Sequence, residues 1–500
     1  MNRLLKIALL IATCLFFSSQ TFGQNSTTHN PTWWAKYQYL SQNAASSGVG
    51  SSSSLTVGSN VDVSNECGPQ SETFITLNPV SSKSLAAGAN EIFRDPMRGY
   101  FSTDGGSAWG ALDLPLPPPL QGTNDHRFGS DPSLVFDSRG NLFYSYIVVY
   151  FGGGNGVDGT QMAVARSTDG GKSYPQLTLF AFQSGSNHFN DKPMITADAN
   201  PASPFRDRIY VAWDAAGGGN ATDGGIHLAR SSDAGATFTI ARVDNPSGPS
   251  QGIGAVPFVG PNGEVYAAWN DIKNNLIAFN RSFDGGATWD AQRTISQKTA
   301  AFDVGIPAEM FRRALVYPAC DTDRSTGLHR GRLYCSWMDL TTLGVTDIFV
   351  SFSDDQGSKW AAPIPVTDQL FPMLVDRFNQ WLAVDAVTGD VNLSFYDTRN
   401  DTTGFRFMTD TFFTQSVDGG VTFRSPNVRV SSASSNEHDC NGLFPCPAID
   451  YGNQQGDYEG LASRGGVSHP IWTDSRRQLD PSSGCSTNLL MEEVFTATVE

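Results

Sequence analysis

The sequence of 500 residues is poor in positive charge and in long apolar runs. Lysine and arginine number 33 against 49 aspartates and glutamates, which gives a formal net charge of -16, and no basic stripe that could follow a phosphate backbone is present. Beyond the amino-terminal segment, no apolar stretch has the roughly 20 residues that span a bilayer. We therefore expect no nucleic-acid partner, no anionic membrane surface as a partner and no transmembrane segment.

Sequence motifs of metal and nucleotide chemistry are missing as well. There is no C-x-x-C pair, no H-E-x-x-H and no G-x-x-x-x-G-K-[ST] motif. No metal site is therefore predicted from cysteine or histidine, and we expect that no cofactor is required. The clustered carboxylates of this acidic chain could instead bind a hard cation such as calcium.

The amino-terminal segment predicts export. Residues 1–23 have the layout of a secretory signal, with two basic residues, an apolar run and a small residue, Gly23, before the expected cleavage point. Residues 24–54 are rich in serine and glycine and predict a tether, because such a composition cannot bury a core. Residues 55–500 then form the folded domain, which we expect to be a monomer in the periplasm or outside the cell.

Cysteine usage agrees with an oxidising compartment. Of seven cysteines, Cys14 lies in the signal segment, so six remain, an even number that suits disulfides. Their connectivity is not fixed by the sequence. The favoured pairs are Cys320 with Cys335 across a hairpin, Cys440 with Cys446 within a loop, and Cys67 with Cys485.

One short phrase, S-x-D-x-G-x-x-[WYF], occurs six times. The aspartates of the six copies are Asp104, Asp169, Asp233, Asp284, Asp355 and Asp418. A serine and an aspartate two residues apart can both accept hydrogen bonds from the backbone N–H groups of a tight turn, and glycine takes the positive φ that such a turn needs. We interpret each phrase as a hairpin turn that caps itself and whose aromatic residue packs.

The phrase resembles the Asp box, or BNR repeat, of the sialidase-type β-propellers. Successive copies are 51 to 71 residues apart, a spacing that suits one four-stranded blade each. The resemblance covers the chain from about residue 55 onward. It implies an all-β propeller similar to the secreted, bacterial-style sialidases.

Seven blades are expected, with six, the number in the sialidases themselves, as the alternative. The six phrases account for six blades. Residues 55–63 resemble the outer strand that follows the sixth phrase, and residues 457–462, 467–472 and 493–499 could supply the three inner strands of a seventh blade. Strands from both ends of the chain would then close the ring and remove its exposed edge.

The functional face is predicted to lie opposite the six phrases. In an up-and-down blade, the turn between strands three and four lies on one face and the start of strand one on the other, where a concave site forms around the axis. The acids that open inner strands are Asp131, Asp191, Asp376 and Asp457. The acids that follow second strands are Asp214, Asp271, Asp339, Asp397 and Asp474. Carboxylates gathered in a partly desolvated funnel raise one another's pKa and could act as acid and base, unless each only caps its strand or pairs with an arginine.

The resemblance also implies roles for individual residues. Sialidases bind the substrate carboxylate with three arginines and use a tyrosine nucleophile backed by a glutamate, with an aspartate as acid/base. The matching set here is Arg377, Arg399 and Arg476, accompanied by Asp397 and Asp474, with Tyr458 and Glu459 as the nucleophile pair. Arg94 lies in the segment closest to the Arg-Ile-Pro signature of the family. Strand alternation favours a packing role for Tyr458 instead, since neighbours on a strand point to opposite faces.

Two functional classes follow from these residues. The first is a glycoside hydrolase of exo-sialidase type that acts on glycans at the axial funnel. The second is a non-catalytic propeller that binds a glycan, a protein or a cation through the same face, because propellers host many functions.

Overall fold

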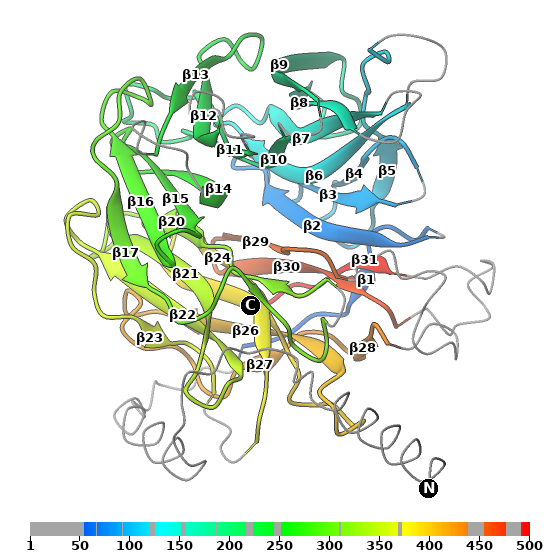
Figure 1. Ribbon diagram of the computed structural model, residues 1–500, viewed down its shortest axis with the longest axis vertical. Coiled ribbons are helices and arrows are strands. Elements are labelled where there is room, and N and C mark those ends of the chain that lie inside the picture. Colours follow the sequence, from blue (N-terminus) through cyan, green and yellow to red (C-terminus); the bar gives the residue numbers. More distant parts are fainter. Residues whose placement is uncertain are drawn as a thin grey trace, which may run out of the picture.

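The structure is a computed structural model. It describes residues 55–66, 68–92, 94–120, 126–151, 157–185, 189–216, 224–244, 252–309, 312–368, 373–438, 455–476 and 492–500. Within them every regular element is a β-strand (Figure 1), and no helix is long and apolar enough to cross a membrane. The expected signal segment and tether, together with Cys67, Cys440, Cys446 and Cys485, lie outside the described residues.

Seven antiparallel blades follow one another around a central axis (Figure 1), as predicted, and each begins with its innermost strand. Blade 1 comprises β2 (Gln70–Leu77), β3 (Leu85–Glu91), β4 (Arg98–Ser102) and β5 (Gly110–Asp113). Blade 2 comprises β6 (His126–Phe136), β7 (Leu142–Phe151), β8 (Val157–Ser167) and β9 (Gln176–Ser184). Blade 3 comprises β10 (Phe189–Ala197), β11 (Ile209–Ala216), β12 (Gly225–Ser231) and β13 (Thr239–Arg242). Blade 4 comprises β14 (Gly252–Val259), β15 (Val265–Asp271), β16 (Leu276–Ser282) and β17 (Arg293–Gln297).

The second half of the ring has the same plan with two additions. Blade 5 comprises β20 (Ala319–Thr322), β21 (Leu333–Leu340), β22 (Thr346–Ser353) and β23 (Ile364–Pro365), and the small pair β18 (Asp303–Val304) and β19 (Ala314–Leu315) precedes it. Blade 6 comprises β24 (Arg377–Val384), β25 (Val391–Asp397), β26 (Met408–Ser416) and β27 (Val428–Arg429), with β28 (Ser435–Asn436) added to β26. Blade 7 comprises β29 (Gly460–Arg464), β30 (Val467–Asp474), β31 (Glu493–Thr496) and β1 (Val61–Asp62).

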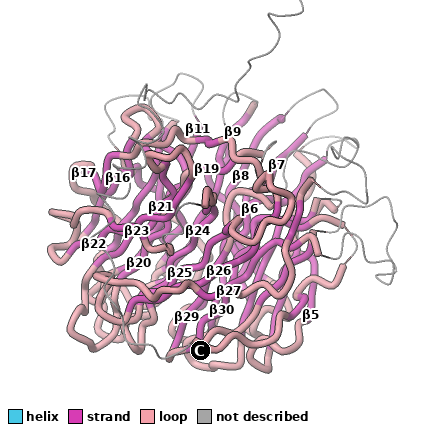
Figure 2. Tube along the Cα trace, turned by 90° about the horizontal axis from the view of Figure 1, so that it is seen from below, coloured by secondary structure: helices cyan, strands magenta, loops and turns pink. Residues whose placement is uncertain are grey.

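Strands from both ends of the chain close the ring, which confirms that prediction. Val61 of β1 pairs with Thr496 of β31, so the first described strand is the outermost strand of the last blade. The inner strands β2, β6, β10, β14, β20, β24 and β29 contact one another in this order, and β29 returns to β2. The turned view in Figure 2 shows the strands running between loops at the two ends of the molecule.

All six S-x-D phrases form turns between the third and fourth strands of their blades. In the first copy the N–H of Gly106 donates to Ser102 Oγ at 2.9 Å, and the N–H groups of Ser107 and Ala108 donate to Asp104 Oδ1 at 3.0 Å. The serine–glycine hydrogen bond recurs in the other five copies at 2.8 to 2.9 Å. The carboxylates of these turns are therefore occupied by their own backbone, on one face of the ring.

Large aromatic side chains fill the space between blades. Trp213, Trp269, Trp337 and Trp472 lie near the ends of the second strands of blades 3, 4, 5 and 7, and each is only 1% exposed. Buried rings of this size contribute much of the apolar area that holds sheets together. The acids that follow these tryptophans are thereby carried to the face opposite the six turns.

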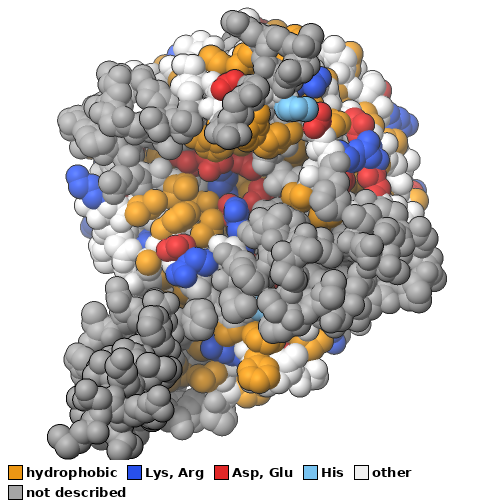
Figure 3. All heavy atoms as spheres, turned by 45° about the vertical axis from the view of Figure 1, so that its right-hand side comes forward, with side chains coloured by type: hydrophobic (Ala, Val, Ile, Leu, Met, Phe, Trp, Pro, Cys, Tyr) orange, Lys and Arg blue, Asp and Glu red, His pale blue; other side chains and the backbone are white. Residues whose placement is uncertain are grey.

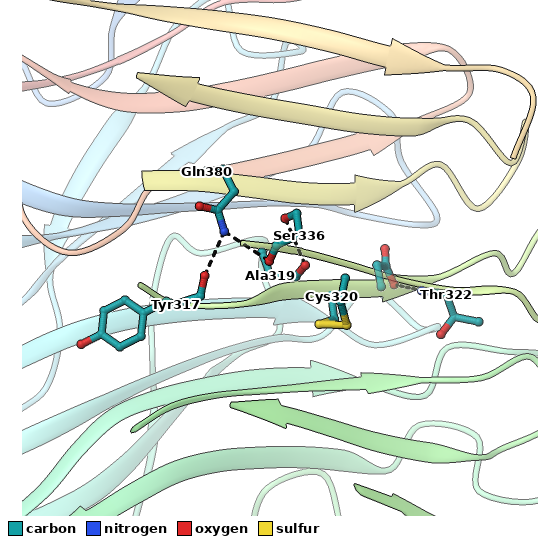
Figure 4. Close-up of a disulfide and its surroundings, with 8 residues drawn as sticks. Tyr317, Ala319, Cys320, Thr322, Ser336 and Gln380 are labelled. Atoms are coloured by element: carbon teal, nitrogen blue, oxygen red, sulfur yellow. Dashed lines mark hydrogen bonds between the residues drawn. A yellow bond between two sulfur atoms is a disulfide. The ribbon is translucent and has the colours of Figure 1, made fainter. Parts of the chain in front are cut away.

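One predicted disulfide is present. Cys320 of β20 and Cys335 of β21 face each other in the strand register and are bonded (Figure 4). Beside them, the Gln380 side chain of β24 donates to the carbonyl oxygens of Tyr317, at 2.9 Å, and Ser336, at 3.3 Å. Blade 5 is thus tied internally by the disulfide and to blade 6 by a buried amide.

Candidate functional site

Five inner strands share an irregularity in their pairing. In β2, β6, β10, β14 and β24 the pairing with the second strand shifts at a bulge. The bulge residues and their φ angles are Glu72 (54°), Asp131 (61°), Lys192 (48°), Gly254 (68°) and Asn379 (47°). A left-handed backbone costs a residue other than glycine about 1 to 3 kcal/mol, and a bulge re-aims its side chain. In four blades the bulge residue is not a glycine, so the left-handed backbone there is strained.

These positions define a ring with one residue per blade. Each bulge residue lies two residues before the point where regular pairing resumes, and Tyr317 and Tyr458 lie at the same spacing before β20 and β29. We call the seven positions the axial ring: Glu72, Asp131, Lys192, Gly254, Tyr317, Asn379 and Tyr458. Six side chains and one glycine therefore meet at the mouth of the axis that lies opposite the six turns.

A pocket of about 620 Å³ opens at this mouth. Its charged lining residues are Glu72, Glu91, Asp95, Asp131, Asp191, Asp457, Arg94 and Arg312. Figure 3 shows acidic and basic side chains together in a hollow of the surface, bordered by hydrophobic ones. The axial pocket, as we call it, is strongly acidic, with six carboxyl groups against two guanidinium groups.

Arg312 joins carboxylates from two blades. It lies on the connection between β18 and β19, and its Nε donates to Asp457 Oδ1 at 2.7 Å. Its Nη2 lies 3.4 Å from Glu72 Oε1. Glu72 also accepts hydrogen bonds from Asn90 Nδ2, at 2.9 Å, and from the N–H of Asp457, at 3.3 Å. Because Glu72 belongs to blade 1 and Asp457 to blade 7, these contacts lie across the seam where the ring closes.

Asp131 and Asp191 form a second carboxyl pair between blades 2 and 3. Asp131 accepts hydrogen bonds from the Ser130 hydroxyl at 2.7 Å and from the N–H of Lys192 at 3.0 Å. Burial, the charges of Asp131 and Asp214, and a hydrogen bond between the Asp131 and Asp191 carboxyl groups raise the pKa of Asp191. Asp191 is partly exposed to the pocket, so a carboxyl group that favours its protonated form meets the solvent there.

Other carboxyl groups around the pocket are also shifted. Burial and the charges of Asp457 and Asp131 raise the pKa of Glu72. Burial raises the pKa of Asp214 to about 7, and burial with the nearby charge of Glu66 raises the pKa of Glu91 to about 7. Groups with such values can give or take protons near neutral pH, which is the requirement for acid–base catalysis.

A lysine lies directly beneath these carboxyl groups. Lys192 is only 2% exposed, and its Nζ lies 3.5 Å from the ring centre of Tyr317 and 3.7 Å from that of Tyr458. The Tyr317 hydroxyl in turn lies 3.4 Å from Asp457 Oδ2. Burial lowers the pKa of Lys192, and the charges of the surrounding carboxylates oppose that effect. The ammonium group therefore lies between two aromatic faces at the centre of the axial ring.

Three of the acids predicted from the sequence lie together in this pocket: Asp131, Asp191 and Asp457. The fourth, Asp376, is buried beside blade 6, where it accepts a hydrogen bond from Arg406 at 2.7 Å, and it does not line the pocket. Asp271 and Asp339 accept hydrogen bonds from residues close to them, Asn274 and Thr299, and also lie outside the pocket lining.

The structure does not bring the three arginines of the sialidase-like set to the axial pocket. Arg377 pairs with Asp397 at 2.9 Å, and Arg399 pairs with the same carboxylate at 2.6 Å. Arg476 pairs with Asp474, two residues before it, at 2.6 Å. The guanidinium groups of Arg399 and Arg476 also lie over the rings of Phe412 and Phe495. These contacts lie within blade 6 and within blade 7, and they leave the arginines outside the lining of the pocket.

Tyr458 and Glu459 point in different directions, as strand alternation predicted. The Tyr458 hydroxyl donates to the carbonyl oxygen of Pro132 at 3.0 Å, while its ring faces Lys192. Glu459 is buried on the other side and accepts a hydrogen bond from the N–H of Thr473 at 3.3 Å. The two side chains therefore do not form a nucleophile pair at the pocket.

Sequence reasoning missed Glu72, Glu91, Lys192, Arg312 and Tyr317. One signal was available in the sequence. Each ring residue lies two residues before the regularly paired part of its inner strand, and by this rule Lys192 of blade 3 is equivalent to Asp131 of blade 2. The acid at the start of this strand is Asp191, the residue before the ring position. Among the described residues, no group of three or more His, Cys, Asp or Glu side chains has the arrangement of a metal site, and calcium binding stays a prediction.

Comparisons with known proteins concern the architecture. No protein-family model and no curated protein matches the sequence. Among solved structures, the leech intramolecular trans-sialidase is 13% identical, with 75% of this chain and 72% of that chain covered and a TM-score of 0.49. The NanB sialidase from Streptococcus pneumoniae is 12% identical over 74% and 70% of the two chains, with a TM-score of 0.46. The Penicillium chrysogenum alpha-L-arabinanase is 11% identical over 89% and 98%, with a TM-score of 0.44.

Proposed function

We propose that this chain is a secreted glycoside hydrolase of the sialidase-type propeller class and that its reaction takes place in the axial pocket. The observation that carries the proposal is the meeting, in one pocket, of two carboxyl groups in opposite electrostatic environments. Asp191 lies beside Asp131 and favours its protonated form, whereas Asp457 is paired with Arg312. Pairs of carboxyl groups whose surroundings differ in this way supply the acid and the base of glycoside hydrolysis.

The proposed reaction assigns one proton transfer to each group. Asp191 gives its proton to the glycosidic oxygen of the leaving group while the bond from that oxygen to the anomeric carbon breaks. Asp457 takes a proton from the water that attacks the anomeric carbon. Arg312 orients Asp457 through its hydrogen bond, and burial together with the charge of Asp131 raises the pKa of Asp191 and so favours its protonated form.

The charge of the pocket favours a neutral glycan over a sialoside. Six carboxyl groups and two arginines line it, and both arginines already have partners. Arg94 pairs with Asp113 at 2.8 Å, and Arg312 pairs with Asp457. A substrate carboxylate would therefore enter a negative pocket without a free cation to receive it, which makes sialosides the less favoured class.

The test is hydrolysis of fluorogenic glycosides, both a sialoside and a panel of neutral sugars, by the full chain. We expect activity on at least one neutral glycoside, and kcat/KM lower by about 100-fold or more in Asp191→Asn and in Asp457→Asn. Asp354→Asn is the matched control, because Asp354 pairs with Arg332 on the exposed surface near the fifth turn. Binding of glycans without hydrolysis would establish the non-catalytic alternative in place of the enzyme.

The remaining expectations belong to the same proposal. The Cys320–Cys335 disulfide supports export, because such bonds persist in oxidising compartments. We propose a monomer that needs no cofactor, so that activity should persist in EDTA. Activity that EDTA removes and calcium restores would instead assign the calcium site that the acidic funnel could form.

A further inference from the structure

We propose that Lys192 is a positioning residue that sets the charge state of the pocket carboxyl groups from beneath, without touching the substrate. This inference rests on the proposed function, because the charge state matters only if these groups transfer protons. The argument starts from the axial ring, since Lys192 is the one ring member that carries a positive charge.

The backbone at Lys192 is built to hold this position. Its φ of 48° is left-handed, and the bulge between Asp191 and Met194 turns it out of the regular pairing. In this conformation its N–H donates to Asp131 Oδ2 at 3.0 Å while its side chain points across the axis. One residue thus contacts the carboxyl pair of blades 2 and 3 and also reaches the far side of the ring.

The side chain is held by rings from two distant blades. Tyr317 belongs to blade 5 and Tyr458 to blade 7, and both lie within 4 Å of the ammonium nitrogen of Lys192. Aromatic faces attract a cation without supplying a hydrogen-bond acceptor that could take its proton. The Lys192 side chain is therefore fixed in place between the two rings, and it is absent from the pocket lining.

Five carboxyl groups interact electrostatically with the Lys192 side chain. Asp457, Glu72, Asp131 and Asp191 act on Lys192 through their charges, and Lys192 in turn acts on Asp214. The other cation beside the group, Arg312, is engaged by Asp457 and Glu72. Lys192 thus interacts with both carboxyl pairs of the site, the pair of Glu72 and Asp457 and the pair of Asp131 and Asp191.

The first test is the pH dependence of kcat/KM in the full chain. Lys192→Met keeps the apolar stem between the two tyrosines and removes the charge, so both limbs of the profile should move to higher pH by about one unit or more. Lys192→Arg should keep the limbs near those of the wild type. Lys298→Met is the matched control, because Lys298 is a second buried lysine, bonded to Asn275 and the carbonyl oxygen of Ala300 in blade 4.

The second test needs no substrate and so separates this inference from the proposed function. Removal of the charge makes the carboxyl groups bind protons more tightly in the folded state, so Lys192→Met should lose free energy of unfolding relative to the wild type as pH rises from 5 to 8. Urea unfolding at several pH values measures this difference. A uniform loss at every pH, or unchanged limbs of the activity profile, would show that Lys192 only packs and would overturn the inference.

Discussion

The ring of Tyr317 occupies the space that a side chain at Gly254 would fill. A Cβ atom at residue 254 would lie 2.0 Å from Cδ1 of Tyr317, far inside van der Waals contact. The glycine in blade 4 therefore allows the tyrosine of blade 5 to reach Lys192 and Asp457. The axial ring works as an interlocked set, in which an absent side chain at one position makes room for a large one at the next.

Gly254→Ala should disrupt this set. The left-handed φ of 68° alone costs an alanine about 1 to 2 kcal/mol, and displacement of Tyr317 adds to that cost. We expect a larger fall in the free energy of unfolding than the backbone alone explains, together with weaker hydrolysis. Gly465→Ala is the control, since Gly465 has a φ of 64° and nothing within 4 Å of a Cβ. Equal losses in the two variants would contradict the packing relationship.

Glu91→Gln should change how stability depends on pH. Burial and the charge of Glu66 raise the pKa of Glu91 from 4.5 to about 7, so its favourable contribution is present below pH 4.5 and is lost as pH rises through about 7. The rise corresponds to about 3 kcal/mol as an upper bound. The glutamine variant should match the wild type near pH 5 and exceed its stability near pH 8 in urea unfolding. The opposite trend would exclude a raised pKa at this position.

Removal of the disulfide should destabilise the ring. Cys320 and Cys335 are separated by 15 residues, and a crosslink that closes a loop of this size contributes about 3 kcal/mol by restricting the unfolded chain. The double variant Cys320→Ala/Cys335→Ala should therefore unfold at lower urea concentration. The wild type treated with a reductant should behave in the same way, and resistance of both samples would show that blade 5 needs no crosslink.

The aspartates of the six turns should stop contributing to the free energy of unfolding only in strong acid. Hydrogen bonds from the hydroxyl and N–H of Thr237 lower the pKa of Asp233 to about 2. Its contribution is therefore present above the unfolded pKa of about 4 and is lost as pH falls through 2. Because Asp233 is exposed, Asp233→Asn should cost only about 1 kcal/mol near neutral pH. A difference that vanished already near pH 4 would contradict the lowered pKa.

The blades could be predicted because their signals are local. The six turns depend on a serine, an aspartate and a glycine within a few residues, and the outer strand of blade 7 resembles in sequence the strand after the sixth turn. The bulges could not be predicted, because an extra residue in one strand leaves no mark in the sequence. An alignment by acids makes Asp191 equivalent to Asp131, whereas the register makes Lys192 the residue of blade 3 that is equivalent to Asp131 of blade 2.

The position of some residues of the candidate pocket could be predicted, and that of others could not, for a related reason. Asp131, Asp191 and Asp457 begin inner strands, so topology alone brought them to one mouth of the axis. Arg312 comes from a connection between β18 and β19, and its place above the axis depends on packing between distant segments. Arg399 and Arg476 are expected from the sequence to bind the substrate, but each pairs with an aspartate two residues before it. Pairing with a carboxylate so close in the sequence costs the least conformational entropy.

The most direct measurement is the rate of glycoside hydrolysis by the wild type, Asp191→Asn, Asp457→Asn and Asp354→Asn, compared on the neutral glycoside that the wild type cleaves best. The axial pocket predicts a loss of about 100-fold or more in the first two variants and a wild-type rate in the third. A wild type that cleaves none of the glycosides, or pocket variants that remain as active as the surface variant, would contradict it.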